Sequence, residues 1–224
     1  MIKLQRSTDR RYVRSGSQEM WMTFDHTGFR ALDVLNEVRL LPGAKSRFQS
    51  DGDQESVTYV REGRLVARHR PNRDEYLGPG YCQRANAHPL MITGAPDESP
   101  FQGAHLFVSS MIPRQPEGEP SCERKHYPYS DRRGILRLIA SPDGCDGSLR
   151  LQQDVRIYSS VLDRGRHVVH ELRSGRGVWL HVVTGRIRLV DQGLETGDGA
   201  SLDDESAVSF TAEKASEILL FDLA

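Results

Sequence analysis

The sequence predicts an all-β protein made of two similar domains in tandem, each a barrel or a sandwich. Short β-branched and aromatic runs recur at intervals of about ten residues and are bounded by turn residues. No stretch with helical periodicity is longer than two turns. Turns also follow the same order in the two halves, Glu62-Gly63 then Gly78-Pro79-Gly80, and Thr184-Gly185 then Gly197-Asp198-Gly199. This order indicates an internal duplication.

The first half begins with an edge strand, and the residues from there to Phe29 are expected to be irregular. Val57, Tyr59 and Val60 belong to a strand that reaches the turn at Glu62-Gly63, so residues 57–69 predict a β-hairpin. The strands predicted in this half are 2–4, 31–41, 57–69 as a hairpin, 81–85 and 105–111.

A stretch rich in proline and charge, residues 113–133, separates the halves. Proline removes a backbone donor, so we expect a linker there and not a central strand. The predicted domains are therefore an N-terminal barrel over 1–112, the linker, and a C-terminal barrel over 134–224. The strands predicted in the second half are 135–140, 149–153, 155–162, 167–172, 178–183, 186–190, 199–202, 207–211 and 217–223.

Composition excludes several classes of protein. Thirty Lys and Arg against 31 Asp and Glu give a formal net charge of -1, so no global field favours nucleic acid or an anionic membrane. No run of about 18 apolar residues predicts a membrane span, and we expect a cytoplasmic protein. Three cysteines without a CxxC pair argue against a disulfide framework and a structural zinc site.

The spacing of residues 43–63 carries a further signal. Gly43 is followed by five residues, then Gln49, one residue, Asp51, three residues and Glu55, and Gly63 closes the stretch. This spacing resembles the first cupin motif, in which a His-x-His pair stands where Gln49 and Asp51 stand here. Alternate strand residues face the same way, so such a pair presents two imidazoles to one metal.

The second half resembles the pirin family of bicupins, in the bacterial branch that includes quercetin 2,3-dioxygenase-like proteins. The motifs that carry the resemblance are Ser141-Pro142-Asp143-Gly144, Gly147-Ser148-Leu149 with Gln153-Asp154, Val178-Trp179-Leu180, and residues 216–223. The resemblance implies two double-stranded, jelly-roll-like β-barrels in tandem. It also implies one metal, usually iron, held in the N-terminal barrel by two His of the first motif and a His and a Glu of the second.

Carried onto this chain, the four ligand positions fall on Gln49, Asp51, Thr93 and Ala95. None of them has the residue type that the family pattern requires. We therefore expect a degenerate, metal-free site with no cofactor, where the family would use iron or another divalent transition metal. The pocket that would hold the metal in the family would keep polar residues in this chain, with Glu55 as an additional lining residue.

Two other metal sites are conceivable in this region. Asp51, Asp53 and Glu55 alternate and could present carboxylates to calcium or magnesium, but a solvated acidic loop is the expected reading. A set of Asp51, Glu55 and His88 could hold a transition metal for a working dioxygenase. His88 precedes Pro89 in a predicted turn, where a surface role is expected.

The remaining histidines and cysteines have simpler expectations. His167 and His170 differ by three, so on a strand they face opposite sides, and with His181 they are expected to be structural or on the surface. Cys122 lies near Arg124 and Lys125 and is a redox candidate with a lowered pKa. Cys82 is expected in the core.

The sequence thus predicts a pirin-like bicupin that has lost its dioxygenase metal and binds a small molecule or a protein partner in a regulatory or stress-related setting. One alternative is a quercetin 2,3-dioxygenase-type enzyme with atypical ligands. The other is a redox-responsive protein acting through Cys122.

Overall fold

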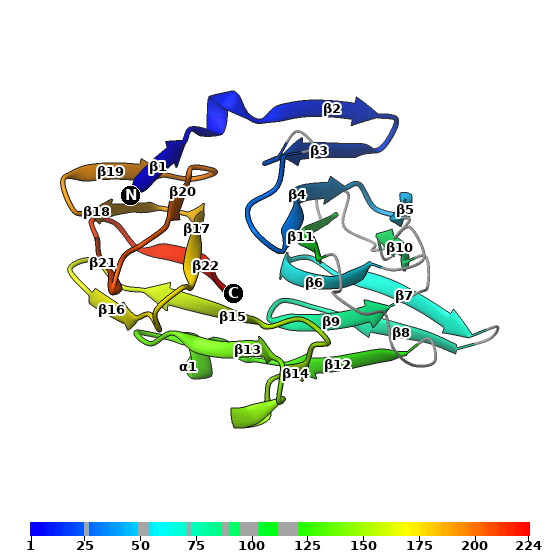
Figure 1. Ribbon diagram of the computed structural model, residues 1–224. Helices are drawn as coiled ribbons and strands as arrows, with labels where there is room; N and C mark the ends of the chain where they lie inside the picture. Colours follow the sequence, from blue (N-terminus) through cyan, green and yellow to red (C-terminus); the bar gives the residue numbers. More distant parts are fainter. Residues whose placement is uncertain (25–26, 49–53, 71–72, 87–89, 95–102, 112–120) are drawn as a thin grey trace. The chain divides into compact units, whose positions relative to one another are not determined.

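The computed structural model describes residues 1–24, 27–48, 54–70, 73–86, 90–94, 103–111 and 121–224 (Figure 1). The chain forms two compact units. The N-terminal unit holds residues 11–28 and 32–128, and the C-terminal unit holds residues 1–10, 29–31 and 129–224. The all-β prediction is confirmed: the one α-helix among the described residues is the four-residue α1, Tyr129–Arg132. No helix in that part of the chain is long and apolar enough to span a membrane.

The N-terminal unit consists of two antiparallel sheets. The longer sheet has the order β12-β9-β6-β11-β4-β3-β2, and the shorter has the order β5-β10-β7-β8. Its strands are β2 Arg11–Ser15, β3 Gln18–Met22, β4 Leu32–Leu40, β5 Lys45–Phe48, β6 Glu55–Glu62, β7 Leu65–Arg70, β8 Arg73–Leu77, β9 Tyr81–Asn86, β10 Leu90–Gly94, β11 Ala104–Met111 and β12 Cys122–His126.

The C-terminal unit repeats this plan. Its longer sheet has the order β1-β20-β17-β22-β15-β13-β14, and its shorter sheet the order β16-β21-β18-β19. Its strands are β1 Ile2–Gln5, β13 Arg137–Ser141, β14 Leu149–Arg150, β15 Val155–Leu162, β16 His167–Glu171, β17 Gly177–Thr184, β18 Arg186–Leu189, β19 Gln192–Glu195, β20 Gly199–Leu202, β21 Ala207–Ala212 and β22 Ser216–Leu223. Of these, the sequence pattern missed β19.

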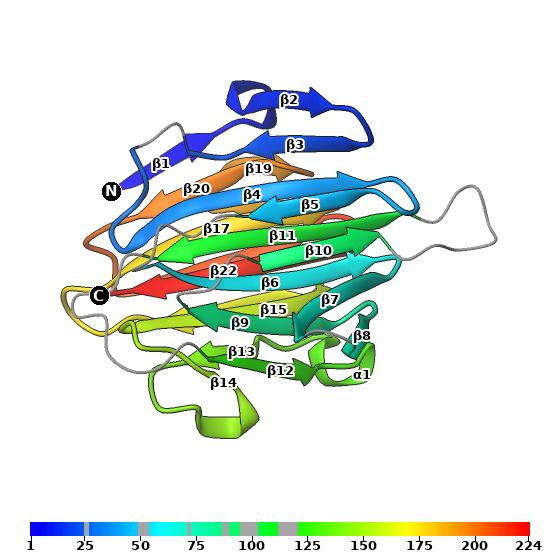
Figure 2. The same ribbon diagram turned by 90° about the vertical axis from the view of Figure 1, so that its right-hand side faces the viewer.

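The two strand orders match position by position. In the N-terminal unit β9, β6, β11 and β4 lie side by side (Figure 2), and β20, β17, β22 and β15 have the same order and the same antiparallel pairing. The turn at Gly63 follows β6, and the turn at Gly185 follows β17. Aligning these two glycines superposes the strands in register, so the predicted duplication is confirmed.

The flanking strands correct the predicted boundaries. Residues 1–10, expected in the N-terminal barrel, belong to the other unit, because β1 pairs with β20 from Ile2↔Leu202 to Gln5↔Gly199. The expected linker also contains regular structure, since β12 pairs with β9 over five residues. In each case the added strand, β1 or β12, pairs with a strand at the edge of a sheet. The pairing gives hydrogen-bond partners to backbone N–H and C=O groups that the edge would otherwise leave unpaired.

Two further predictions are wrong in the N-terminal unit. Residues expected to be irregular before Phe29 form the antiparallel pair β2 and β3, and β3 extends the longer sheet beside β4. The predicted hairpin at Glu62-Gly63 is not a hairpin, because β6 belongs to the longer sheet and β7 to the shorter. Gly63 has φ +76°, and a Cβ there would lie 1.8 Å from the Gly103 carbonyl oxygen, so only glycine fits this change of sheet.

The space between the sheets is filled differently in the two units. In the C-terminal unit the core is apolar and continuous, and includes Leu180, Val182, Phe210, Ile218 and Leu220. Among the residues that the structure describes, the N-terminal core includes Val38, Val60, Leu106 and Val108.

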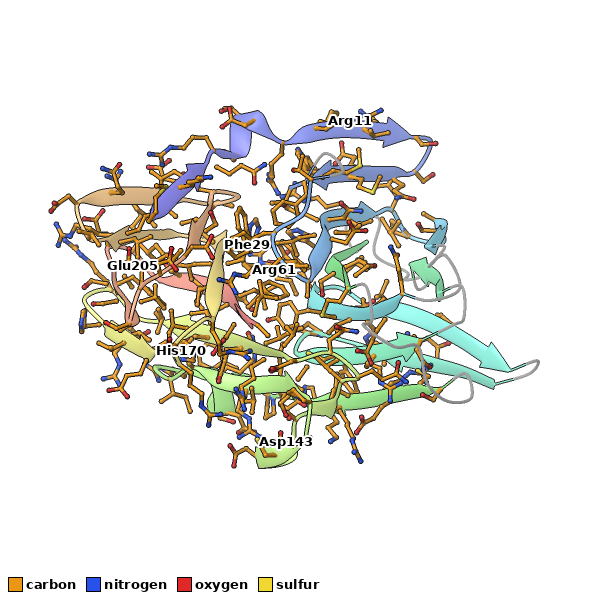
Figure 3. The ribbon with its side chains drawn as sticks, viewed as in Figure 1. Arg11, Phe29, Arg61, Asp143, His170 and Glu205 are labelled. Carbon is orange, nitrogen blue, oxygen red and sulfur yellow. The ribbon has the colours of Figure 1, made fainter. Side chains whose placement is uncertain are left out.

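A charged cluster closes one end of the C-terminal core. Asp222, on β22, accepts hydrogen bonds from His170 Nε2 at 2.9 Å and from Arg176 Nε (Figure 3 labels His170). Arg176 also donates to the Asp222 carbonyl oxygen at 2.9 Å and to Asp154 Oδ1 at 2.8 Å. Since β16 and β22 belong to different sheets, the His170–Asp222 contact bridges the two.

This cluster determines how Asp222 titrates. Burial acts to raise the pKa of the Asp222 carboxyl, but hydrogen bonds from His170 and Arg176 outweigh it and lower the pKa below the usual value. A lowered folded-state pKa contributes stability that is complete above the unfolded-state pKa of about 4. That contribution is lost as the pH falls through the lower pKa of the folded protein.

We predict that Asp222→Asn lowers the free energy of unfolding at pH 7 by about 3 kcal/mol, because it leaves the Arg176 charge buried without its main partner. The loss should shrink as the pH falls below about 4. Urea unfolding of the intact protein measures both. Asp154→Asn is the matched control, since Asp154 contacts the same arginine from an exposed position and should change stability by under about 1 kcal/mol. Equal losses in the two variants would contradict the bridging role.

Candidate functional site

Most of the positions predicted to line the N-terminal pocket lie outside the described residues. These are Gln49, Asp51 and Ala95, together with His88 and Asp53 of the alternative metal sites. Thr93 is on β10, where its backbone pairs with Lys45 of β5 and Val66 of β7. The strands of the longer N-terminal sheet lie within the described residues, and their side chains define the interior of this barrel.

Comparing the two units identifies a polar end inside the N-terminal barrel. Thr58 pairs with Val108, as Leu180 of the C-terminal unit pairs with Leu220. Along the same face, Val60 corresponds to Val182 and is apolar in both units, whereas Ser56 corresponds to Val178 and Gln83 to Ala200. At these three positions the C-terminal barrel carries aliphatic side chains where the N-terminal barrel carries hydroxyl and amide groups, whereas Ser110 corresponds to Asp222.

We call this set the polar cluster. It consists of side chains on the core-facing side of β4, β6, β9 and β11, and its members are Asn36, Ser56, Thr58, Gln83 and Ser110. Thr58 and Gln83 are each only 1% exposed. Ser56 donates to the Ala85 carbonyl, whereas the Thr58 hydroxyl has no hydrogen-bond partner among the described residues. A buried hydroxyl without a partner costs free energy, so it marks a place where a ligand or water is needed.

Arg124 adds a positive charge beside the polar cluster. It stands opposite Gln83 across the β9–β12 pair and therefore lies on the same face. Its Nε donates to Gln83 Oε1 at 2.7 Å. Burial lowers the pKa of the Arg124 guanidinium, which nevertheless stays protonated near neutral pH. A half-buried guanidinium held by a buried amide is a preorganised donor for an anionic or strongly polar ligand group.

Glu55 was expected in the same pocket but lies on the opposite face of the sheet. It is next to Ser56 on β6, and neighbours on a strand point to opposite sides. The carboxylate is fully buried, 3.7 Å from Arg84 Nε. Arg84 in turn donates to Ser121 Oγ at 2.6 Å. Glu55 therefore belongs to a buried ion pair behind the polar cluster.

Cys122 lies on the same face as Arg124, two residues earlier on β12, and pairs with Ala85. The expectation of a lowered pKa is wrong. Cys122 is an exposed residue, but partial burial of its thiol raises the pKa to about 11, against a lowering contribution from Arg84. Cys82 is in the core, as predicted, with no exposed surface.

The C-terminal histidines take structural positions. His170 is in the Asp222 cluster, and His167 contacts Thr211 Oγ1 at 3.0 Å on the other side of β16, so the predicted opposite orientation is confirmed. His181 is buried.

The ligand set implied by the family does not fit the residues of this chain. Iron, nickel and copper favour imidazole nitrogens. The four positions predicted from the resemblance offer, by sequence, an amide, a carboxylate, a hydroxyl and, at Ala95, no donor atom. Within the described ranges, no three His, Cys, Asp or Glu side chains are grouped so that they could hold a metal ion.

Sequence reasoning missed the polar cluster although a signal was present. Aligning Gly63 with Gly185 sets Thr58 against Leu180 and Ser56 against Val178. This comparison shows polar residues at two inward positions of β6 where β17 carries aliphatic side chains. Arg124 had no such signal, because it stands in a stretch that reads as a linker.

Comparisons with known proteins agree with this architecture. The family model described as the quercetinase C-terminal cupin domain matches residues 138–223. A quercetin 2,3-dioxygenase of Escherichia coli K12 is 29% identical over the whole chain and 99% of its own length. The pirin-like protein YhaK of the same organism is 26% identical over 88% of the chain and 84% of its own length.

The fold agrees with solved structures over its full length. The bacterial pirin YhhW from Escherichia coli, solved in complex with nickel(II), superposes with a TM-score of 0.86 at 29% identity, covering all of this chain and 99% of that one. Together with the duplicated two-sheet barrels and the matched C-terminal cupin domain, this similarity shows that the chain has the bicupin fold and is similar to the proteins of the pirin family.

Proposed function

We propose that this protein is a metal-free pirin-family bicupin that binds a small polar or anionic molecule in its N-terminal barrel. The observation that carries the proposal is the contrast between the two barrels, one filled with aliphatic side chains and the other lined by the polar cluster and Arg124. Such a lining inside a barrel suits a small ligand better than a protein surface. We place this activity in the cytoplasm, in a regulatory or stress-related role.

The family's dioxygenase activity is the rival function. Relatives are named quercetin 2,3-dioxygenase, and one neighbour was solved with nickel(II). Dioxygen chemistry on a flavonol depends on a metal that binds the substrate and mediates electron flow. The four family positions of this chain carry no imidazole, which favours ligand binding without turnover.

We predict less than about 0.1 equivalent of transition metal per chain, because an amide, a carboxylate and a hydroxyl bind such ions weakly. Inductively coupled plasma mass spectrometry of protein purified without chelator measures this. Oxygen consumption with quercetin, after addition of iron, copper or manganese, should equal the protein-free control. A stoichiometric metal, or metal-dependent oxygen uptake, would establish the rival function.

Arg124→Gln should weaken binding of quercetin, used as a polar aromatic probe, by about tenfold or more. The change removes a charge-assisted hydrogen bond from a partly buried donor. Fluorescence quenching or calorimetry gives the dissociation constants. Arg64→Gln is the control, since Arg64 is an exposed arginine of the same unit in the turn after Gly63. If the wild type binds quercetin and Arg124→Gln binds it with the same affinity, Arg124 is not part of the binding site.

The redox alternative depends on a reactive thiolate at Cys122. With a pKa of about 11, only about one thiol in ten thousand is ionised at pH 7. We predict that iodoacetamide alkylates Cys122 in the folded protein at least about 30-fold more slowly than in the urea-unfolded protein at pH 7. Mass spectrometry of the Cys122 peptide measures both rates. Rapid alkylation, with a peroxide response that Cys122→Ser abolishes, would support the redox function instead.

A further inference from the structure

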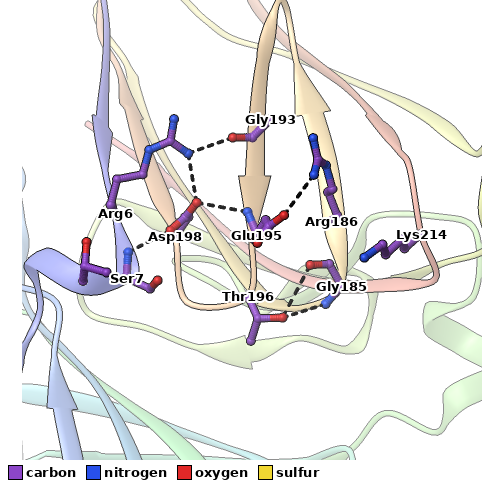
Figure 4. Close-up of a pocket in the computed structure, with 10 residues that line it drawn as sticks. Arg6, Ser7, Gly185, Arg186, Gly193, Glu195, Thr196, Asp198 and Lys214 are labelled. Carbon is purple, nitrogen blue, oxygen red and sulfur yellow. Dashed lines mark hydrogen bonds and ion pairs between the residues drawn. The ribbon is translucent and has the colours of Figure 1, made fainter.

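A pocket of about 600 Å³ lies in the C-terminal unit, remote in sequence from the residues of the polar cluster (Figure 4). Three segments form it: the turn after β1 with Arg6, Ser7 and Thr8, the β18–β19 hairpin with its following turn, and Lys214 before β22. The N-terminal segment supplies one wall, so the pocket exists only because β1 pairs with β20.

The acidic side chains in this pocket are already engaged. Asp198 accepts hydrogen bonds from the backbone N–H groups of Ser7 at 2.7 Å and Glu195 at 3.0 Å, and from Arg6 Nη1 at 3.0 Å. Burial acts to raise the pKa of Asp198, but these hydrogen bonds lower it, so the group is an anion at neutral pH. Asp198 thus anchors the N-terminal segment, and Arg6 also donates to the Gly193 carbonyl at 2.7 Å.

The basic side chains differ in how far they are engaged. Arg186 pairs with Glu195 at 2.9 Å and Glu213 at 2.7 Å. The Lys214 backbone bonds to Arg186 and Ser216, but its side chain makes no hydrogen bond or ion pair within the described part of the chain and extends toward the turn that carries Gly185 and Thr196 (Figure 4). Its ammonium group is therefore available to a ligand.

A second pocket of about 450 Å³ shares Arg186 and Lys214 with the first and adds Arg164 and Arg188. The two pockets together carry five basic and three acidic side chains, in a protein whose formal net charge is -1. Local positive charge of this kind concentrates anions. Ser7 and Thr8 add hydroxyl groups to the lining, and the Thr8 hydroxyl also donates to Asp9 Oδ1 at 3.5 Å.

We propose that these adjoining pockets form a binding site for a small phosphate-bearing molecule. A phosphoryl group offers several acceptor oxygens and up to two negative charges, which matches an ammonium, guanidinium groups and hydroxyls converging from different segments. The phosphate lies between Lys214 and the Arg6–Thr8 wall. Binding therefore ties the N-terminal segment more firmly to the C-terminal unit.

Calorimetric titration with sodium pyrophosphate at low ionic strength tests the site in the full-length protein. We expect a dissociation constant in the micromolar to low millimolar range. Lys214→Gln should weaken it at least about fivefold, because it removes the unpaired charge, and Lys214→Arg should retain it. Lys3→Gln is the matched control, since Lys3 is an exposed lysine on β1 that lines neither pocket, and it should change affinity less than twofold.

Hydrogen exchange distinguishes this site from general charge attraction. Pyrophosphate should slow amide exchange in residues 6–10 of the wild type and not of Lys214→Gln, whereas sodium acetate at equal ionic strength should slow it in neither. The proposal is overturned if pyrophosphate does not bind at 10 mM, or if Lys214→Gln and Lys3→Gln bind it alike.

Discussion

The space between the two sheets of each unit must be filled, and most of this structure follows from how each unit meets that requirement. In the C-terminal unit aliphatic side chains occupy the interior, and the Asp222 cluster closes its end by joining β16 to β22. Asp222 and Arg176 each have several partners, which offset the desolvation cost of burying their charges. This unit is therefore a filled barrel with structural histidines.

The N-terminal unit has the same strands in the same order and a different filling. Its apolar core covers one end, and the other end carries Thr58, Gln83 and Arg124. Because the strand orders of the two units match, the asymmetry lies in the side chains that fill them. A polar barrel end costs stability unless something occupies it, which is the basis for assigning ligand binding to this unit.

The sheet edges explain the path of the chain. β1 and β12 occupy equivalent edge positions, next to β20 and β9 respectively, although one comes from the N-terminus and the other from the end of the N-terminal unit. Phe29–Ala31 also belongs to the C-terminal unit, where Arg30 pairs with Asp203 at 2.9 Å. Residues 6–7 are likewise held on the C-terminal unit, by Asp198. They form one side of the pocket that Lys214 also lines.

Local pattern was enough to identify the all-β class, the duplication and most strand positions, because turn residues and β-branched runs act within a few residues. The replaced metal ligands stay a prediction from the sequence, since Gln49 and Asp51 lie outside the described residues. Pairing partners required the folded chain: β6 and β7 look like a hairpin but enter different sheets, and β12 looks like a linker but completes an edge. The pKa of Cys122 also required the folded chain. Its basic neighbours in the sequence predict a lowered pKa, whereas burial of the thiol raises it. These properties depend on contacts between residues far apart in the chain, and no local pattern encodes them.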